Sequence, residues 1–277
     1  MSGGPPIRID PDDIAALIRR AAEECILPRF RRLARHEVRE KSPGNLVTAA
    51  DVEAERLLSR LLSETLPGAA MIGEEAAAHD PAILARLGEH DAAWIVDPVD
   101  GTHQFAHGNP EFAVIVALVA RGAVCAGWIH DPVRNTTVAA EAGAGTWRLG
   151  DAAGPTRLEL APAPPLGTAR GVLLGKLASG ARASEVARAR LAAGPVSFVR
   201  SAGQIYLHLV EGGLEYAFFT RALPWDHAAG WLIHAEAGGY GRFLDGASYS
   251  PSRHVGPILY APDRGMWRTI AEVLERG

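Results

Sequence analysis

The segment from Trp94 to Gln104 constrains this chain more than any other part of its sequence. An apolar run predicts a buried strand, and it ends in two carboxylates three residues apart, Asp97 and Asp100. The proline between them stiffens the backbone, and the glycine and threonine that follow predict a turn and a helix N-cap. Two oxygen ligands on a rigid turn beside a helix N-terminus suit a divalent cation together with a phosphate group. The full segment reads Trp94-Ile95-Val96-Asp97-Pro98-Val99-Asp100-Gly101-Thr102-His103-Gln104.

Asp-Pro and Asp-Gly pairs also occur in ordinary turns, so a loop with capping carboxylates is the alternative interpretation. Two further acidic motifs favour a chemical site. Gly73-Glu74-Glu75 follows an apolar patch upstream, and Trp225-Asp226-His227-Ala228-Ala229-Gly230 opens an alanine-rich helix downstream. Each motif stands at the border of an expected helix or strand, which indicates a site that only folding assembles.

Composition excludes several classes of function. The 277 residues are 48% hydrophobic and 22% charged, which is typical of a globular protein with a sizeable core. A net charge of -4 and the lack of a basic block argue against a nucleic-acid surface. No segment reaches membrane-spanning length and no apolar signal core begins the sequence, so we expect a cytoplasmic protein without membrane contacts. Cys25 and Cys125 lie in apolar contexts and are expected to be reduced and buried.

Motifs of other chemistries are missing. The sequence has no Walker loop, no G-x-S-x-G elbow and no Cys or His pair with zinc-ligand spacing near a carboxylate motif. His103 and His227 are not expected to be ligands, and His227 is expected to point away from the site. Structural roles are expected for His130, His208 and His234.

Periodicity and capping signals predict the helices and strands of the first half. One helix is expected from Asp10 to about Arg35, kinked at Pro28, and a second from Thr48 to about Pro67. The next segments predict a short helix and then an antiparallel meander. The ranges are strand 70–72, helix 80–87 and strands 94–96, 112–119, 123–129 and 136–140.

Residues 150–166 are rich in Gly, Ala and Pro, and we place a subdomain boundary there. Residues 1–150 are expected to form an α+β subdomain with most of the ligands, and residues 151–277 an α/β subdomain that supplies Asp226 and the substrate pocket. The second half is expected to contain strands 171–174, 197–200, 214–219 and 240–243 and helices 183–191, 202–210 and 226–237.

Taken together, the motifs resemble those of the inositol monophosphatase-like family of metal-dependent phosphatases. The family signature W-I-x-D-P-[IVL]-D-G-T follows G-E-E and precedes W-D-x-A-A-G, in the order found here. The segment from Lys41 to Asp51 resembles a fourth family motif, K-S-x-x-D-L-V-T-x-x-D, with Asn45 in place of its first aspartate. The resemblance covers nearly the whole chain. It implies an α/β (α+β) fold, a layered α-β-α-β-α sandwich of the sugar-phosphatase type, with the active site between two subdomains.

The resemblance also implies two or three Mg²⁺ ions and a site for hydrolysing phosphate monoesters. Asp97 would bridge two ions, and Glu75 would hold a third ion or hydrogen-bond the other ligands. The Thr102 hydroxyl would orient the attacking water, with Asp51 accepting its proton or hydrogen bond and Glu74 as a further catalytic residue. The implied metal ligands are Glu74, Asp97, the carbonyl of Val99, Asp100 and Asp226. Phosphate would bind the backbone amides of Gly101, Thr102 and His103.

The identity of the substrate is left open. Counting back from Asp226, the position of the sugar-binding acid in inositol-specific relatives falls at Phe219, whose ring cannot accept hydrogen bonds from hydroxyls. Arg221 would meet an anionic group of the substrate, or is a solvated loop arginine. The remaining candidate substrate residues are Ser201, Ala202 and Gly203, which resemble the family's R-S-x-G segment.

The expected function is therefore Mg²⁺-dependent hydrolysis of a small phosphorylated metabolite. Histidinol phosphate, a 3′-phosphonucleotide and fructose 1,6-bisphosphate are alternative substrates, and a non-enzymatic regulatory homologue is the alternative class. The resemblance also implies a homodimer, to which residues 112–129 would contribute a contact unless they fill the internal core.

Overall fold

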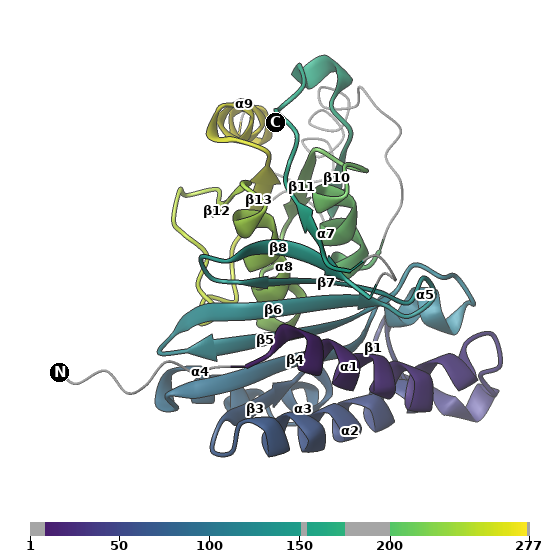
Figure 1. The fold of residues 1–277 in the computed structure, drawn as a ribbon. Coiled ribbons are helices and arrows are strands. Elements are labelled where there is room, and N and C mark those ends of the chain that lie inside the picture. The colour runs from purple at the N-terminus through teal and green to yellow at the C-terminus, as the bar shows by residue number, and fades with distance from the viewer. Residues whose placement is uncertain (1–8, 151–153, 175–199, 276–277) are drawn as a thin grey trace.

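The computed structural model describes residues 9–150, 154–174 and 200–275. They form five layers: a helical layer, a seven-stranded sheet, a helix pair, a four-stranded sheet and one further helix. In Figure 1 the seven-stranded sheet lies in the lower part and the four-stranded sheet with α9 in the upper part. This is the α-β-α-β-α sandwich that the family resemblance implies. Three clusters of buried apolar side chains separate the layers.

The first layer contains α1 (Pro11–Ala21) and α2 (Ala49–Thr65). Asp10 caps α1 by accepting a hydrogen bond from the Asp12 amide, as its sequence predicts. On the other face of the sheet, α3 (Glu74–His79), a 3₁₀ turn (Pro81–Ala85) and α4 (Arg86–Glu89) share the cluster that contains Ile95.

The first helix is shorter than expected. After α1 the backbone widens into a π-helical turn (Ala22–Ile26), tightens into a 3₁₀ turn (Leu27–Arg29), and reverses at Arg31, where φ is 59°. Pro28 has no N–H to donate to the carbonyl four residues earlier, so the regular α-helix cannot continue through it. The expectation of a helix to Arg35 is therefore wrong.

An unpredicted hairpin of β1 (Val38–Ser42) and β2 (Asn45–Thr48) follows. Its first strand is mostly charged and carries no apolar alternation. Lys41 lies on the first strand of this hairpin, and Thr48, the last residue of the second strand, directly precedes α2.

The seven-stranded sheet has the order β3-β4-β5-β6-β7-β8-β9. β3 and β4 are parallel, and every later pair is antiparallel, which confirms the predicted meander and extends it by two strands. The last strand lies beyond residue 150, so the sheet continues past the expected boundary. The bounds are β3 (Ala70–Gly73), β4 (Ala92–Asp100), β5 (Ala113–Ala120), β6 (Ala123–Asp131), β7 (Thr136–Glu141), β8 (Gly145–Leu149) and β9 (Thr156–Leu158).

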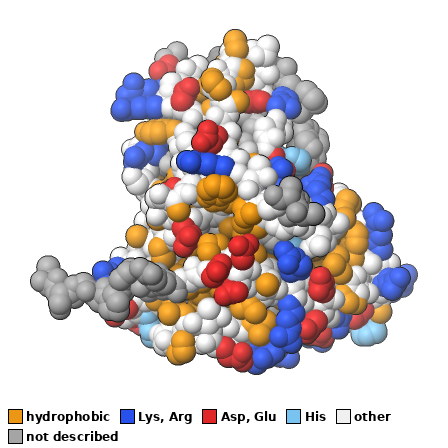
Figure 2. All heavy atoms as spheres, viewed as in Figure 1, with side chains coloured by type: hydrophobic (Ala, Val, Ile, Leu, Met, Phe, Trp, Pro, Cys, Tyr) orange, Lys and Arg blue, Asp and Glu red, His pale blue; other side chains and the backbone are white. Residues whose placement is uncertain are grey.

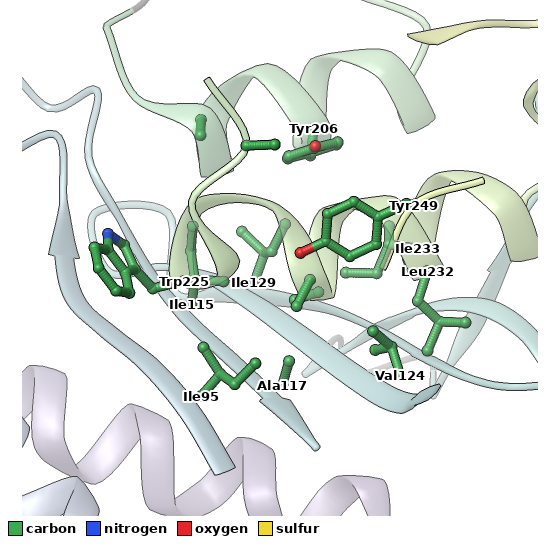
Figure 3. Packing of buried hydrophobic residues seen from close by; sticks show 14 of the residues in the cluster. Ile95, Ile115, Ala117, Val124, Ile129, Tyr206, Trp225, Leu232, Ile233 and Tyr249 are labelled. Atoms are coloured by element: carbon green, nitrogen blue, oxygen red, sulfur yellow. The ribbon is translucent and has the colours of Figure 1, made fainter. Parts of the chain in front are cut away.

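The helices α7 (Ala202–Val210) and α8 (Pro224–Glu236) lie between the two sheets. Figure 3 shows their apolar side chains above those of the first sheet, with Ile115 and Ile129 pointing from the strands toward α8. A Cβ on Gly127 would lie 2.7 Å from the Ala229 Cα, so β6 and α8 meet almost backbone to backbone. This close packing brings the start of α8 to the sheet.

The second sheet has the order β10-β11-β13-β12, with β10 and β11 parallel and the other pairs antiparallel. Its strands are β10 (Gly171–Leu174), β11 (Tyr216–Phe219), β12 (Tyr240–Phe243) and β13 (Ile258–Ala261), and α9 (Arg264–Glu275) covers its outer face. β13 and the 3₁₀ turn Leu166–Thr168 were not expected from the sequence. The expected helix 183–191 lies outside the described residues, as does the expected strand 197–200 apart from Arg200, which is in no helix or strand.

Several expectations about surfaces can be compared with the structure. β5 is buried along most of its length, and most of β6 with it, so these strands fill the internal core.

Cys25 is buried, whereas Cys125 is only half-buried; both are free thiols. On the face drawn in Figure 2, acidic, basic and apolar side chains are interspersed. Within the described residues, no helix combines the length and apolar character needed to cross a bilayer.

Candidate active site

The central motif ends β4 at a break in its pairing with β5. The register shifts between Asp97 and Asp100, where the proline between them cannot donate a ladder hydrogen bond. The Val99 amide donates to Asp97 Oδ1 at 3.1 Å, which holds that carboxylate in place. Gly101 then adopts a φ of 90°, and a Cβ there would lie 3.0 Å from the Ser201 Cβ. The glycine is therefore required for both the turn and the close approach of α7.

Asp226 reaches the same place from α8. That helix begins at Pro224, two residues before the predicted start, because a proline is well suited to the first helical turn. Asp97, Asp100 and Asp226 each offer an oxygen, and these oxygens all lie within 4.8 Å of one another. Two distant segments of the chain thus meet in one three-carboxylate cluster, as the motifs predict.

The cluster is electrostatically costly without a cation. Burial, together with the charges of Glu74 and Asp100, raises the pKa of Asp97 well above its usual value. Burial and the neighbouring carboxylates likewise raise the pKa of Asp226. Burial raises the pKa of Asp100 to about 6, although hydrogen bonds from Ser201 and two backbone amides oppose the shift. A cation bound among these side chains would offset the repulsion.

Glu74 and Glu75 begin α3 beside the cluster. The Lys41 Nζ lies 2.9 Å from Glu74 Oε1 and 2.8 Å from Glu75 Oε1, so one ammonium group bridges both carboxylates. Burial opposes the charge of Lys41, but the two carboxylates outweigh it and raise the lysine's pKa. The expectation that Glu74 belongs near the site is consistent with its charge, which acts on all three aspartates.

Thr102, at the end of the central motif, lies in contact with Asp51 of α2. Asp51 forms a capping box with Thr48 at the start of α2. The Thr102 hydroxyl lies 3.0 Å from Asp51 Oδ1 and 3.0 Å from the Val99 carbonyl oxygen. Asp51 is fully buried, and burial raises its pKa to about 7 against the effect of the Thr48 hydrogen bonds.

Ser201, Ala202 and Gly203, the residues that resemble the family's R-S-x-G segment, all donate hydrogen bonds to Asp100. The Ser201 hydroxyl donates to Asp100 Oδ2 at 2.5 Å, and the Gly203 amide donates to the same oxygen at 2.6 Å. The Ala202 amide donates to Asp100 Oδ1 at 3.2 Å. These groups are buried and hold Asp100 in place, and their contact with a substrate stays a prediction. The start of α7 is thereby joined to the end of β4.

Phe219, which the sequence places where inositol-specific relatives have a sugar-binding acid, is buried in the structure. It is the last residue of β11, only 5% exposed, and its ring packs against Tyr206, His227 and Tyr260. The side chain faces the helix pair because alternate residues of a strand point to opposite faces. It therefore belongs to the core, and the first exposed side chain beyond it in this loop is Arg221.

Among the described residues, no histidine belongs to the cluster of Asp97, Asp100 and Asp226. The Nδ1 of His227 lies 2.7 Å from the Tyr206 hydroxyl, away from the cluster, and burial lowers its pKa to about 3. His103 is exposed and stacks on His107 with ring centroids 4.2 Å apart. His130 and His234 are buried, and burial lowers their pKa values to about 4 and about 3.

Sequence reasoning missed Glu55, a buried carboxylate on α2. Its oxygens accept hydrogen bonds from the amides of Glu75 and Ala76 at 2.8 and 2.9 Å. A signal was present in the sequence, since Glu55 stands one helical turn after Asp51 and a charged side chain on the buried face of a helix needs a partner.

Comparison with known proteins identifies the family. The model of the inositol monophosphatase family matches residues 11–270. An inositol-1-monophosphatase of Mesorhizobium japonicum is 35% identical over 214 residues, 76% of each chain, and inositol monophosphatase 1 of Sus scrofa is 30% identical over 72% of each.

Solved structures share the fold. Thermotoga maritima IMPase superposes with a TM-score of 0.78 at 25% identity, covering 96% of each chain. The staphylococcal protein SaIMPase-II, solved with inositol monophosphate and with 2′AMP, gives TM-scores of 0.75 and 0.76 at 23% identity over 96% of this chain and 93% of its own. The chain therefore belongs to the inositol monophosphatase family, a family of phosphatases.

Proposed function

We propose that this protein is a Mg²⁺-dependent phosphomonoesterase that hydrolyses a small phosphorylated metabolite. The observation that carries the proposal is the meeting of Asp97, Asp100 and Asp226 within 4.8 Å, beside the Thr102–Asp51 pair. Phosphatase activity belongs to the family; the ion and the substrate are what we propose here.

The donor set fits Mg²⁺. All the donors of the cluster are oxygens. Asp97 and Asp100 are buried and Asp226 is half-buried, and the raised pKa values of Asp97 and Asp226 reflect a deficit of positive charge. Mg²⁺ prefers oxygen ligands and keeps several waters, so a few carboxylates and one carbonyl are sufficient. When bound, such ions neutralise phosphoryl charge and lower the pKa of coordinated water. The residues that would hold two ions are Glu74, Asp97, the Val99 carbonyl, Asp100 and Asp226, and Glu75 would hold a third ion.

Thr102 and Asp51 would direct and deprotonate the attacking water. The Thr102 hydroxyl has one proton and two acceptors at 3.0 Å, Asp51 Oδ1 and the Val99 carbonyl. Its oxygen can therefore accept a hydrogen bond from water while its proton is held by the protein. With its pKa raised to about 7, Asp51 is suited to take up a proton near neutral pH.

The phosphate group would bind at the start of α5 (Thr102–Ala106). Backbone amides at the first turn of a helix point outward and favour anions. Gly101, with its φ of 90°, turns the chain so that the amides of Gly101, Thr102 and His103 follow directly after the carboxylates.

The alcohol part of the substrate would meet Arg221 rather than Phe219. Arg221 is exposed, and its charge acts on Asp226, so it lies at the edge of the site. A guanidinium there favours a substrate with a second anionic group over a neutral polyol. SaIMPase-II has been solved with a nucleotide as well as with inositol monophosphate, so the fold admits both kinds of ligand.

The test is phosphate release from a panel of substrates. We would measure kcat/KM for inositol 1-phosphate, histidinol phosphate, adenosine 3′,5′-bisphosphate and fructose 1,6-bisphosphate, with Mg²⁺ and with EDTA. The expected result is metal-dependent phosphate release, with a preference for the bisphosphates, which carry a second anionic group besides the phosphate that is hydrolysed. Absence of phosphate release from every ester in Mg²⁺ would refute the proposed function.

A further inference from the structure

Glu55 makes a contact that links two parts of the candidate active site. It lies on the buried face of α2, and its side chain is 8% exposed. Its two carboxylate oxygens accept hydrogen bonds from the consecutive amides of Glu75 and Ala76, at 2.8 and 2.9 Å. These amides are among the first donors of α3, which have no partner within the helix itself.

The chain leaves room for this contact at Gly73. A Cβ on Gly73 would lie 2.2 Å from the Glu55 carboxyl carbon and 2.3 Å from its Oε2. Any other residue would therefore displace the carboxylate. The glycine of the Gly-Glu-Glu motif is explained by the carboxylate that packs against it.

One face of α2 thus holds two parts of the site at a fixed separation. Asp51 and Glu55 are four residues apart, so their side chains leave the same face of the helix. Asp51 holds the Thr102 hydroxyl, while Glu55 holds the backbone from which the Glu74 and Glu75 carboxylates project. Helix α2 therefore sets the distance between them.

If Glu55 served only to cap α3, its buried charge would be an unfavourable choice. Burial raises its pKa to about 7, and the charges of Glu75 and Glu74 add to the effect, although the two backbone hydrogen bonds oppose it. A serine or asparagine would cap a six-residue helix without a buried charge. The long side chain of Glu55 reaches from α2 to α3 and accepts hydrogen bonds from two α3 amides at once, which limits rotation of α3.

We propose that Glu55 is a positioning residue that fixes the orientation of α3 and thereby sets the affinity of Glu74 and Glu75 for metal. The inference rests on the proposed function, since it assigns Glu55 to the same metal site. It predicts that loss of the contact weakens metal binding while the reaction at saturating metal is largely retained.

The experiment compares Glu55→Gln with wild type and with a matched control. Glu236 also accepts two backbone hydrogen bonds, from the Gly143 and Gly145 amides at 2.8 and 3.0 Å, but on a turn between β7 and β8. Mg²⁺ affinity would be measured by calorimetry without substrate, and the half-saturating Mg²⁺ concentration and kcat by steady-state assays. Glu55→Gln should weaken Mg²⁺ binding on the order of 10- to 100-fold, as is usual when a partner of a metal ligand is removed. Glu236→Gln should leave it unchanged.

A second variant covers the case in which Glu55→Gln does not fold. Gly73→Ala keeps the carboxylate and displaces it, so it should weaken Mg²⁺ binding in the same direction. Unchanged Mg²⁺ affinity in the folded Glu55→Gln protein, or in Gly73→Ala when the former is unfolded, would overturn the inference. An equal loss in Glu236→Gln would overturn it too. If wild type itself binds no Mg²⁺, the proposed function has failed instead.

Discussion

Replacing Asp97 with asparagine should stabilise the metal-free protein and abolish its metal-dependent activity. The oxygens of Asp97, Asp100 and Asp226 lie within 4.8 Å of one another. Two like charges at that separation repel by about 3.5 kcal/mol at an effective dielectric constant of about 20. Asparagine keeps the oxygen that accepts from the Val99 amide at 3.1 Å, so the variant loses the charge and not the local structure.

The sign of the pH dependence follows from the raised pKa of Asp97. A carboxyl whose folded-state pKa is raised contributes stability while it is protonated, and that contribution is lost as pH rises through the folded-state value. Wild type should therefore become less stable relative to Asp97→Asn as pH increases. Protonation in the folded state relieves part of the repulsion, so the gain in the variant should be about 1–3 kcal/mol at about pH 8 and smaller at about pH 5.

In Mg²⁺, wild type should be more stable than Asp97→Asn, the reverse of the order expected in EDTA. A ligand that binds only the folded state at 100 times its Kd adds about 2.7 kcal/mol of stability, and the variant lacks the bridging carboxylate needed for tight binding. Urea unfolding of both proteins in EDTA and in Mg²⁺, at both pH values, measures the effect. Asp263→Asn is the control, since Asp263 caps α9 through the Met266 amide on the outer layer. An Asp97→Asn protein that is less stable than wild type in EDTA at about pH 8 would refute the reasoning.

Four further predictions concern activity and assembly. Activity should require Mg²⁺ and be suppressed by Ca²⁺, whose looser coordination does not match octahedral geometry; full turnover after exhaustive chelation would contradict the proposed mechanism. Thr102→Val should lower kcat/KM by about 10²–10⁴, whereas Thr102→Ser should retain most activity because it keeps the hydroxyl beside Asp51; equal steady-state rates for the two variants would count against this role. Arg221→Met should raise KM for a bisphosphate by roughly 10- to 100-fold, the value of a hydrogen bond to a charged group, with little effect on p-nitrophenyl phosphate; a uniform effect on both substrates would remove Arg221 from substrate recognition. We also propose a homodimer, and light scattering that shows a monomer at micromolar concentration would exclude it.

Features that depend on local sequence could be predicted. The caps at Asp10 and Thr48 and the meander of β5, β6 and β7 follow from residue types and periodicity within a few positions. The carboxylates at the end of β4 were recognisable because strand, turn and helix start are each encoded by adjacent residues. Their meeting with Asp226 was inferred from the combination of motifs and is observed in the structure.

The roles of residues that act across layers could not be read from the sequence. Phe219 stands where counting from Asp226 predicts a pocket wall, but strand alternation and the position of α7 turn its ring toward Tyr206. A charged residue in place of Phe219 would be buried among the rings of Tyr206, His227 and Tyr260. Ser201 and Gly203 hold Asp100 because α7 begins directly behind β4.

The sequence by itself showed acidic motifs at the borders of helices and strands and a resemblance to the family to which the chain belongs. Tertiary structure decided which groups hold those carboxylates. Glu55 and the amides of α3 are about twenty residues apart in the chain, and no local pattern relates them. Their contact exists because α2 and α3 pack on β3 and β4, and because Gly73 has no side chain in the space that the Glu55 carboxylate fills. Packing of that kind depends on the whole fold.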